Sequence, residues 1–133
     1  MTNKLELYKC EVCGNLVEVV LSSHGTLVCC NENMKLLSAN KIDASNEKHV
    51  PVIEVTGEEK IIRVGQVPHP MEDVHYIQFI EAISNDGTYL KRKYLKAGDE
   101  PLMKLQCDCE SLKARELCNI HGLWASCDER ETK

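Results

Sequence analysis

The stretch "VHYIQFIEAISNDGTYLKRKYL", residues 74–95, indicates the fold class of this chain of 133 residues. Its first half alternates apolar and polar side chains in part, as a strand with one buried face does. The tripeptide Asn85-Asp86-Gly87 then interrupts the pattern and leads into "TYLKRKYL". Such a tripeptide is typical of a hairpin turn. The stretch therefore predicts two antiparallel strands joined by a tight turn.

Segments on both sides of this hairpin also have the pattern of short strands. "NLVEVVL" and "TLVCC" flank the turn "SSHG", whereas "HVPVIEV" and "KIIRVGQV" are rich in β-branched residues and are separated by the turn "TGEE". The turn "AGDEP" precedes "LMKLQC", and "KARELCN" and "LWASC" follow. "SLKAREL" has helical potential but is too short to change the class. Strands at this spacing predict an all-β protein with a small sandwich or barrel.

The polar stretch "SANKIDASNEK", residues 38–48, divides the chain into two regions. The first region, residues 1–37, is rich in cysteine and too small to hold a core without a metal ion or disulfides. The second, residues 38–133, is predicted to be a β domain, with 38–48 as the linker that leads into it.

The overall composition excludes several classes of protein. The formal net charge is −5 and no long basic stretch is present, which argues against a nucleic-acid binder. No apolar run is long enough to span a bilayer, and "MTNKLELYKCEVCGN" lacks a hydrophobic signal core. We therefore expect a cytoplasmic protein. Disulfides are rare in that compartment, so the eight cysteines indicate metal binding.

Four cysteines in the first region form one candidate metal site. Cys10 and Cys13 make a Cys-x-x-Cys-Gly loop, and Cys29 and Cys30 stand side by side. Four thiolates suit tetrahedral zinc or iron, and composition does not separate the two metals. Adjacent residues tend to point apart, so we expect a distorted angle between the sulfurs of Cys29 and Cys30. The alternative interpretations are a zinc site that only folds the segment, and free thiols or disulfides.

A second candidate site lies in the later region, where imidazole and thiolate groups occur at strand edges and turns. Pro68 and Pro70 restrict the backbone on both sides of His69, which suits a ligand held on a loop. Imidazole and thiolate together suit a redox metal such as iron or copper. Five protein ligands would leave one octahedral position open. The proposed ligands are His49, His69, His75, Cys118 and His121.

These residues resemble a known family. The four cysteines resemble a desulforedoxin-type iron centre, and "EKHVP", "HPMEDVHYI" and "CNIHGLW" resemble the active-site segments of superoxide reductases. Both sets, in this order, resemble desulfoferrodoxin, the two-iron class. The resemblance runs from about Tyr8 to Trp124. It implies a small desulforedoxin-like domain over residues 1–37, followed by an immunoglobulin-like β-sandwich or barrel over residues 38–133.

The resemblance also implies a function. It predicts one-electron reduction of superoxide to hydrogen peroxide, without release of dioxygen, at a mononuclear ferrous ion with four equatorial histidines and Cys118 as axial ligand. Glu47 would bind the ferric ion after turnover, and Lys48 would attract superoxide and orient water. Two iron ions per chain, a rubredoxin-like electron donor and a homodimer are implied as well. The first iron would act as an electron relay or a structural element.

Three cysteines, Cys107, Cys109 and Cys127, belong to neither set. One interpretation is that they are ordinary thiols, with Cys107 and Cys109 on one face of a strand. The alternative is that Cys107 and Cys109, in "CDC", form a metal-binding or redox pair. Two other functions remain open on the residues alone. A one-electron carrier would need only the first centre, and a zinc-stabilised interaction module would need no iron.

Overall fold

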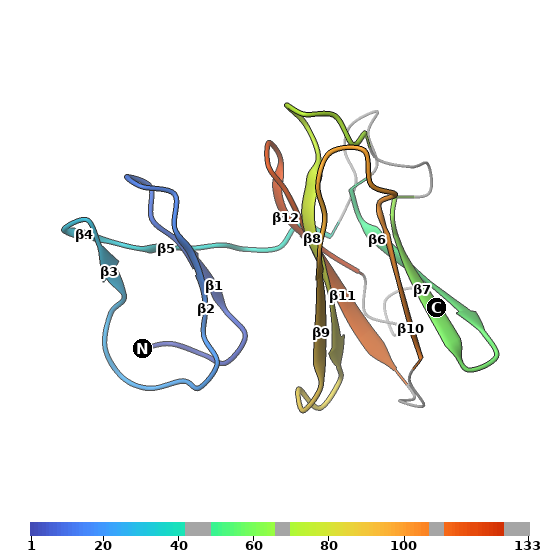
Figure 1. Ribbon diagram of the computed structural model, residues 1–133. Coiled ribbons are helices and arrows are strands. Elements are labelled where there is room, and N and C mark those ends of the chain that lie inside the picture. Colours follow the sequence, from blue (N-terminus) through green and yellow to red (C-terminus); the bar gives the residue numbers. More distant parts are fainter. Residues whose placement is uncertain (42–48, 66–69, 107–110, 127–133) are drawn as a thin grey trace. The chain divides into compact units, whose positions relative to one another are not determined.

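The computed structural model describes residues 1–41, 49–65, 70–106 and 111–126 (Figure 1). Within these ranges the regular secondary structure consists of strands alone, and the described residues contain no helix that could cross a membrane. All strand pairs in the sheets are antiparallel. The prediction of an all-β protein is confirmed. The chain divides into two compact units, Met1–Ser38 and Ala39–Lys133.

The first unit consists of very short strands. β1 is the middle strand of a sheet with order β2-β1-β5, and β3 and β4 form a separate hairpin. The strands are shorter than "NLVEVVL" and "TLVCC" suggested, and β2 and β3 pair with other neighbours. Apolar burial is sparse, because Leu7, Cys10 and Val19 are its only described apolar side chains that are buried. The bounds are β1 Leu7–Lys9, β2 Leu16–Glu18, β3 Val28–Cys29, β4 Glu32–Asn33 and β5 Lys35–Leu36.

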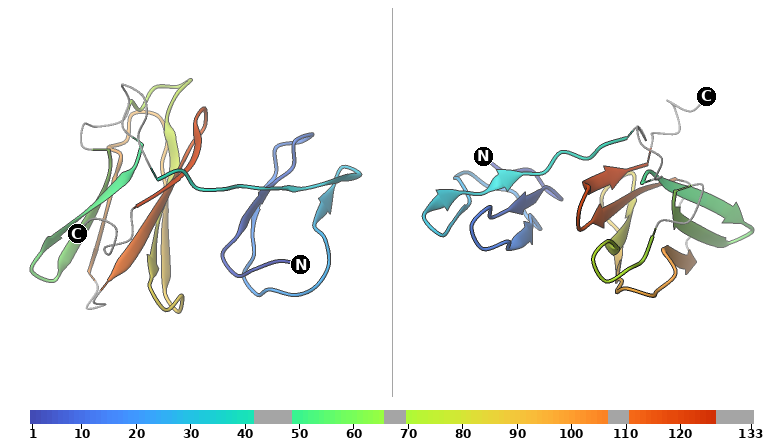
Figure 2. Two further views of the ribbon diagram at one scale, coloured as in Figure 1. Left: turned by 180° about the vertical axis from the view of Figure 1, so that it is seen from behind. Right: turned by 90° about the horizontal axis from the view of Figure 1, so that it is seen from above.

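The second unit contains longer strands in two sheets, which Figure 2 shows from two further directions. One sheet has the order β10-β7-β6 and the other β12-β11-β8-β9. The segment proposed as a possible helix, "SLKAREL", lies almost wholly in strand β11, so the helical alternative is wrong. The bounds are β6 Pro51–Thr56, β7 Glu59–Val64, β8 Ile77–Ser84, β9 Leu90–Tyr94, β10 Leu102–Gln106, β11 Leu112–Cys118 and β12 Gly122–Ala125.

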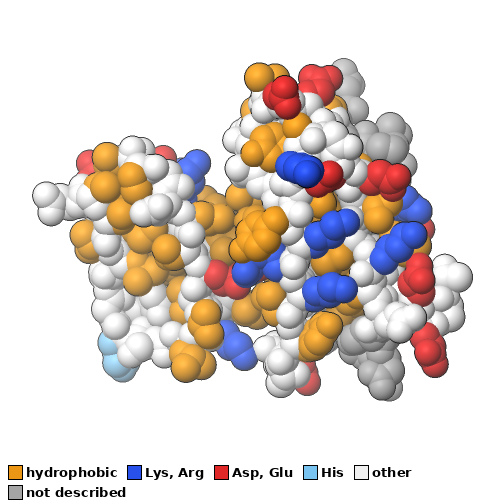
Figure 3. All heavy atoms as spheres, in the orientation of Figure 1, with side chains coloured by type: hydrophobic (Ala, Val, Ile, Leu, Met, Phe, Trp, Pro, Cys, Tyr) orange, Lys and Arg blue, Asp and Glu red, His pale blue; other side chains and the backbone are white. Residues whose placement is uncertain are grey.

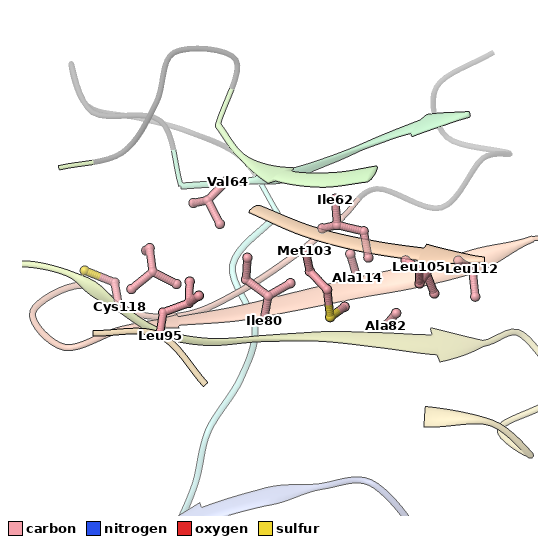
Figure 4. Close-up of a cluster of buried hydrophobic side chains, with 11 residues drawn as sticks. Ile62, Val64, Ile80, Ala82, Leu95, Met103, Leu105, Leu112, Ala114 and Cys118 are labelled. Carbon is pink, nitrogen blue, oxygen red and sulfur yellow. The ribbon is translucent and has the colours of Figure 1, made fainter. Parts of the chain in front are cut away.

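A hydrophobic core lies between these two sheets (Figure 4). Ile62 and Met103 enter it from the three-stranded sheet, and Ile80 and Ala114 enter it from the four-stranded sheet. All four side chains are at most 1% exposed. Apolar burial of this extent is the main stabilising contribution to a sandwich. Cys118, a proposed metal ligand, belongs to the same cluster, so the core extends up to the candidate site.

The predicted turns have the expected geometry. β8 and β9 pair from Phe79 opposite Tyr94 to Ile83 opposite Leu90, and Gly87 adopts φ +73° in the turn between them. A positive φ strongly favours glycine, which explains the Asn-Asp-Gly sequence. The turn "TGEE" likewise joins β6 and β7. Both hairpin predictions are confirmed.

A buried carboxylate on the other face of the four-stranded sheet pairs with two arginines. Glu81 on β8 is fully buried and accepts hydrogen bonds from Arg92 (2.7 and 3.0 Å) and from Arg115 (2.7 and 3.0 Å). Arg92 and Arg115 lie directly opposite Glu81 on the two neighbouring strands. One carboxylate with two guanidinium partners therefore ties β8 to β9 and β11.

Candidate metal centres

The first cysteine group is assembled as predicted. The sulfurs of Cys10, Cys13, Cys29 and Cys30 all lie within 4.8 Å of one another. The Cys13–Cys29 sulfur distance is 3.6 Å, and that of Cys29–Cys30 is 3.9 Å. Sulfurs at about 2.3 Å from a tetrahedral metal ion stand about 3.8 Å apart. The four thiols therefore fit a single ion.

A tight hairpin turn explains how two adjacent cysteines serve one site. Cys29 ends β3 and pairs with Glu32 of β4, leaving Cys30 and Asn31 as the two loop residues. Their φ angles are +52° and +63°, as a type I′ turn requires. The left-handed backbone at Cys30 turns its side chain toward the Cys29 sulfur, which an extended strand would not do. The tendency of adjacent side chains to point apart, on which the expected distorted angle rests, therefore does not apply in this turn.

A backbone N–H group favours the charged form of the Cys10 sulfur, whereas hydrogen bonds among the thiols favour the neutral forms of Cys29 and Cys30. The N–H of Cys13 donates to the Cys10 sulfur (3.4 Å) and is the main cause that lowers the pKa of the Cys10 thiol to about 6. Hydrogen bonding to the Cys13 sulfur raises the pKa of Cys30 to about 12, and hydrogen bonding to Cys10 raises that of Cys29. A metal ion must displace the protons of these last two thiols, so binding here strengthens as pH rises.

The second group lies at one end of the sandwich. His49 precedes β6, His75 precedes β8, Cys118 ends β11 and His121 precedes β12. Their ligand atoms lie within 4.8 Å of one another. The His121 ring centroid is 4.7 Å from that of His49 and 5.0 Å from that of His75. Strand ends from three separate parts of the sequence thus bring three imidazoles and one thiol close together.

A β-bulge adjusts the strand that leads to Cys118. The pairing of β11 with β8 shifts between Leu117, opposite Phe79, and Cys118, opposite Ile77. The shift brings Ile77 into the core beside Ile80, although strict alternation would place them on opposite faces. Bulges commonly redirect side chains next to functional sites. The sequence pattern does not predict this bulge.

Trp124 supports two of the histidines. Its ring stacks on His49 with centroids 4.8 Å apart and an interplanar angle of 17°. Its indole N–H donates to the backbone carbonyl of His121 (3.2 Å). His49 is 1% exposed and Cys118 is 2% exposed. His49 and Cys118 are therefore shielded from solvent, whereas His121 is exposed.

The described residues contain four of the five ligands proposed for this site. His69 lies outside the described residues, as do Glu47 and Lys48 and the additional cysteines Cys107, Cys109 and Cys127. His24 is exposed and belongs to neither cluster, as expected. Sequence reasoning missed Trp124 as a support, although its position directly behind Gly122 and Leu123 was visible.

The ligand atoms differ in kind between the two candidate metal sites. Four thiolates suit iron or zinc, and a mixed set of imidazoles and one thiolate suits a redox-active transition metal. A backbone N–H, that of His121, donates to the Cys118 sulfur (3.4 Å), which stabilises the thiolate form that binds metal. The residues present are therefore able to hold a mononuclear iron at each site.

Comparison with known proteins agrees with this arrangement. A family model described as desulfoferrodoxin matches residues 41–127, and one described as the desulfoferrodoxin N-terminal domain matches residues 2–37. This chain belongs to the desulfoferrodoxin family. It is 52% identical over 126 residues to a desulfoferrodoxin of Syntrophotalea carbinolica, covering 95% of this chain and 98% of that protein. The resemblance inferred from the cysteine and histidine motifs is confirmed.

Other relatives extend the comparison. A desulfoferrodoxin homolog of Archaeoglobus fulgidus is 51% identical over 126 residues, 95% of this chain and 99% of that protein. The crystal structure of a superoxide reductase from Treponema pallidum superimposes with a TM-score of 0.72 at 26% identity. The superposition covers 92% of this chain and 97% of that chain. The desulfoferrodoxin fold therefore extends over both units.

Lysines of β9 are exposed although the chain is acidic overall, and Figure 3 shows basic side chains grouped on one face of the molecule. Lys91 donates to the carbonyl of Lys104 (3.2 Å), and Lys93 donates to that of Leu102 (3.4 Å). β9 and β10 are edge strands of different sheets. The two lysines thus donate to backbone carbonyls at an open sheet edge.

Proposed function

We propose that this chain is a superoxide reductase, which reduces superoxide to hydrogen peroxide without releasing dioxygen. One observation carries the proposal. His49, His75, Cys118 and His121 converge at the end of the sandwich, in a chain of the desulfoferrodoxin family. The structural relative from Treponema pallidum is described as a superoxide reductase. A single thiolate among imidazoles is the feature that separates this site from ordinary structural zinc sites.

We propose that His49, His69, His75, Cys118 and His121 would hold the catalytic ion. Bound ferrous iron supplies the single electron that superoxide requires. Neutral imidazoles and one negative thiolate would leave a bound ferrous site with a net charge near +1, which would attract an anionic substrate. The thiolate raises the electron density at the ion it holds, as it does in haem-thiolate proteins.

Two residues beside His49 complete the proposed site. Lys48 supplies local positive charge in a chain with a net charge of −5, which keeps encounter with an anionic substrate fast. Such steered encounters approach ~10⁹ M⁻¹s⁻¹. Glu47 is proposed to bind the ferric ion after turnover. Both roles follow from the match of "NEKHVP" to the active-site segment of the family.

We propose that residues 1–37 form the unit of the first iron and residues 38–133 the catalytic unit, with 38–48 as linker. The first iron, held by Cys10, Cys13, Cys29 and Cys30, acts as an electron relay or a structural element. Cys13 and Cys30 are exposed, which favours exchange of electrons with an external donor of the rubredoxin type. We further propose a homodimer in the cytoplasm of an anaerobe, where thiols stay reduced.

Metal analysis of anaerobically purified protein, followed by pulsed superoxide, tests this function. We expect two irons per chain and one hydrogen peroxide formed per superoxide consumed, with no dioxygen. His49→Ala should remove one iron and abolish superoxide consumption. Zinc at one per chain, without iron after growth in iron-rich medium, would exclude the reductase and leave an interaction module. Two irons with full activity in the His49→Ala variant would exclude the proposed site.

A further inference from the structure

The side chain of Asn119 bridges two segments that carry ligands of the second centre. Its Oδ1 accepts a hydrogen bond from the backbone N–H of Tyr76 (2.9 Å). Its Nδ2 donates to the backbone carbonyl of Val74 (3.1 Å). These two backbone groups belong to the residues on either side of His75. Asn119 therefore holds the peptide units that flank this histidine.

The backbone of Asn119 adds a third connection at the same point. Its N–H donates to the carbonyl of Tyr76 (3.1 Å). Asn119 directly follows Cys118, the last residue of β11. Three hydrogen bonds thus join the position next to the thiolate ligand to the segment around His75, more than 40 residues earlier in the chain.

Two further features hold the segment that carries His75: the pairing of Ile77 with Cys118 where β8 meets β11, and a tight turn within the segment. Glu72 and His75 exchange hydrogen bonds across a tight turn, from N–H to carbonyl in both directions (2.9 and 3.1 Å). This turn fixes the shape of the segment but not its position relative to Cys118. The pairing of Ile77 with Cys118 fixes the chain two residues after His75, and the Asn119 bridge fixes the peptide units directly beside His75.

We propose that Asn119 is a positioning residue that fixes His75 relative to Cys118 in the catalytic iron site. This inference rests on the proposed function. The bridge needs a side chain that accepts one hydrogen bond and donates another at short reach, which an asparagine amide does and a leucine does not. Groups that orient metal ligands commonly alter metal affinity or activity by about 10–100-fold. Asn119 itself is exposed, so we expect the lower end of that range.

Two substitutions at this position separate hydrogen bonding from packing. Asn119→Leu keeps the branched shape of the side chain and removes both of its hydrogen bonds, whereas Asn119→Ala removes the bonds and most of the side chain. We expect both variants to release the iron of the second centre to a chelator about tenfold faster. We also expect both to shift the visible absorption of the oxidised second centre, since the position of His75 around the ion changes. Full rescue by leucine would show that only packing matters and would overturn the proposal.

Asn85→Leu is a matched control in the same unit. Asn85 donates through its side chain to Ser111 and joins the turn before β9 to the start of β11. It lies at the end of β8 opposite to His75. We expect its thermal stability to fall about as much as that of Asn119→Leu, with iron release and absorption unchanged. Equal changes in iron release in both variants would reduce Asn119 to a structural role and overturn the proposal.

The readouts keep this proposal apart from the proposed function. The full chain is loaded with iron, and release is followed by the iron count per chain, with the absorption of the four-thiolate centre as an internal reference. If the unmodified chain holds two irons but does not consume superoxide, the reductase fails while the test of Asn119 remains valid. If the reductase is active and Asn119→Leu releases iron at the unmodified rate, only the positioning role fails.

Discussion

The two units that carry the metal centres differ in how much hydrophobic core they contain. In the first unit the sulfurs come from two turns, and only three apolar side chains among the described residues are buried. In the second unit the ligands stand at strand ends of a sandwich whose core cluster has eleven buried residues. The comparison suggests that metal folds the first unit, whereas the second unit is folded before it binds metal.

Removal of both irons with a strong chelator tests whether only the first unit needs metal to fold. Unfolding of the first unit is the largest effect that we expect. A structural four-ligand metal ion contributes about 10–16 kcal/mol in small domains, as much as the whole stability of many proteins. We expect amide signals of residues 1–38 to move to random-coil positions and those of the second unit to keep their dispersion. Two-dimensional amide NMR of the apoprotein measures this. A dispersed first unit without metal would contradict the comparison.

Replacement of the proposed thiolate ligand tests the other half of the comparison. Cys118→Ser should lower superoxide consumption by more than about 100-fold, beyond the range of groups that only orient ligands. The second unit should stay folded, since Cys118 is one of many core residues. Stopped-flow consumption of superoxide and circular dichroism check both statements.

Cys13→Ser is the counterpart of Cys118→Ser in the first unit. We expect it to lose the first iron and the fold of that unit, while the ferrous second centre still consumes superoxide. Loss of activity in Cys13→Ser as large as in Cys118→Ser would mean that the units are not independent in function.

Much of the second unit was predictable because its local signals agree with its fold. The Asn85-Asp86-Gly87 turn and the turn at Gly57 are specified by residues that tolerate positive φ. The strand β11, by contrast, had partial helical character and was settled by pairing with β8 and β12. The bulge before Cys118 depends on packing between strands, and no local pattern encodes it.

The candidate sites were predictable in membership but not in geometry. The ligand residues followed from cysteine and histidine spacing and from family motifs. The left-handed backbone at Cys30 was missed, because cysteine rarely adopts it and sequence gave no cue. The bridge by Asn119 was also missed, since its partners are backbone groups of Val74 and Tyr76. Such partners carry no signature in side-chain identity.

Replacement of Glu81 in the apoprotein tests whether the second unit has a stability of its own without metal. Glu81→Gln leaves Arg92 and Arg115 without their charge partner inside a sheet face. Breaking a buried pair costs about 3–5 kcal/mol, and the arginine side chains here keep 24% and 14% exposure. We therefore expect a loss of about 2–3 kcal/mol in denaturant unfolding of the apoprotein, with an unchanged m-value.

Glu54→Gln is the surface control for this measurement. Glu54 accepts from Arg63 at 3.0 Å, and the two side chains are 46% and 45% exposed. Exposed ion pairs contribute about 0–1 kcal/mol, so the variant should stay within about 0.5 kcal/mol of the parent. A loss as large as that of Glu81→Gln would show that charge, and not burial, determines the effect.

Acid titration gives the smallest expected effect and probes the turn of the second unit without its metal. The Asp86 carboxylate accepts from the Ser84 hydroxyl (2.7 Å) and from the N–H and hydroxyl of Thr88 (3.0 and 2.8 Å). These bonds, that from Ser84 foremost, lower the pKa of Asp86 from 3.8 to about 2. A lowered pKa in the folded state adds stability above pH 3.8 that is lost as pH falls toward 2.

Asp86→Asn should remove this part of the acid dependence from the unfolding of the apoprotein. The chain has one tryptophan, Trp124, so its fluorescence reports the second unit alone. If the sandwich is folded before it binds metal, its acid loss should begin near the carboxylate range, about pH 4. A loss that begins near pH 6.5, where histidines gain protons, would instead tie the fold of the sandwich to its ligand cluster. The second unit would then depend on its metal site as the first one does.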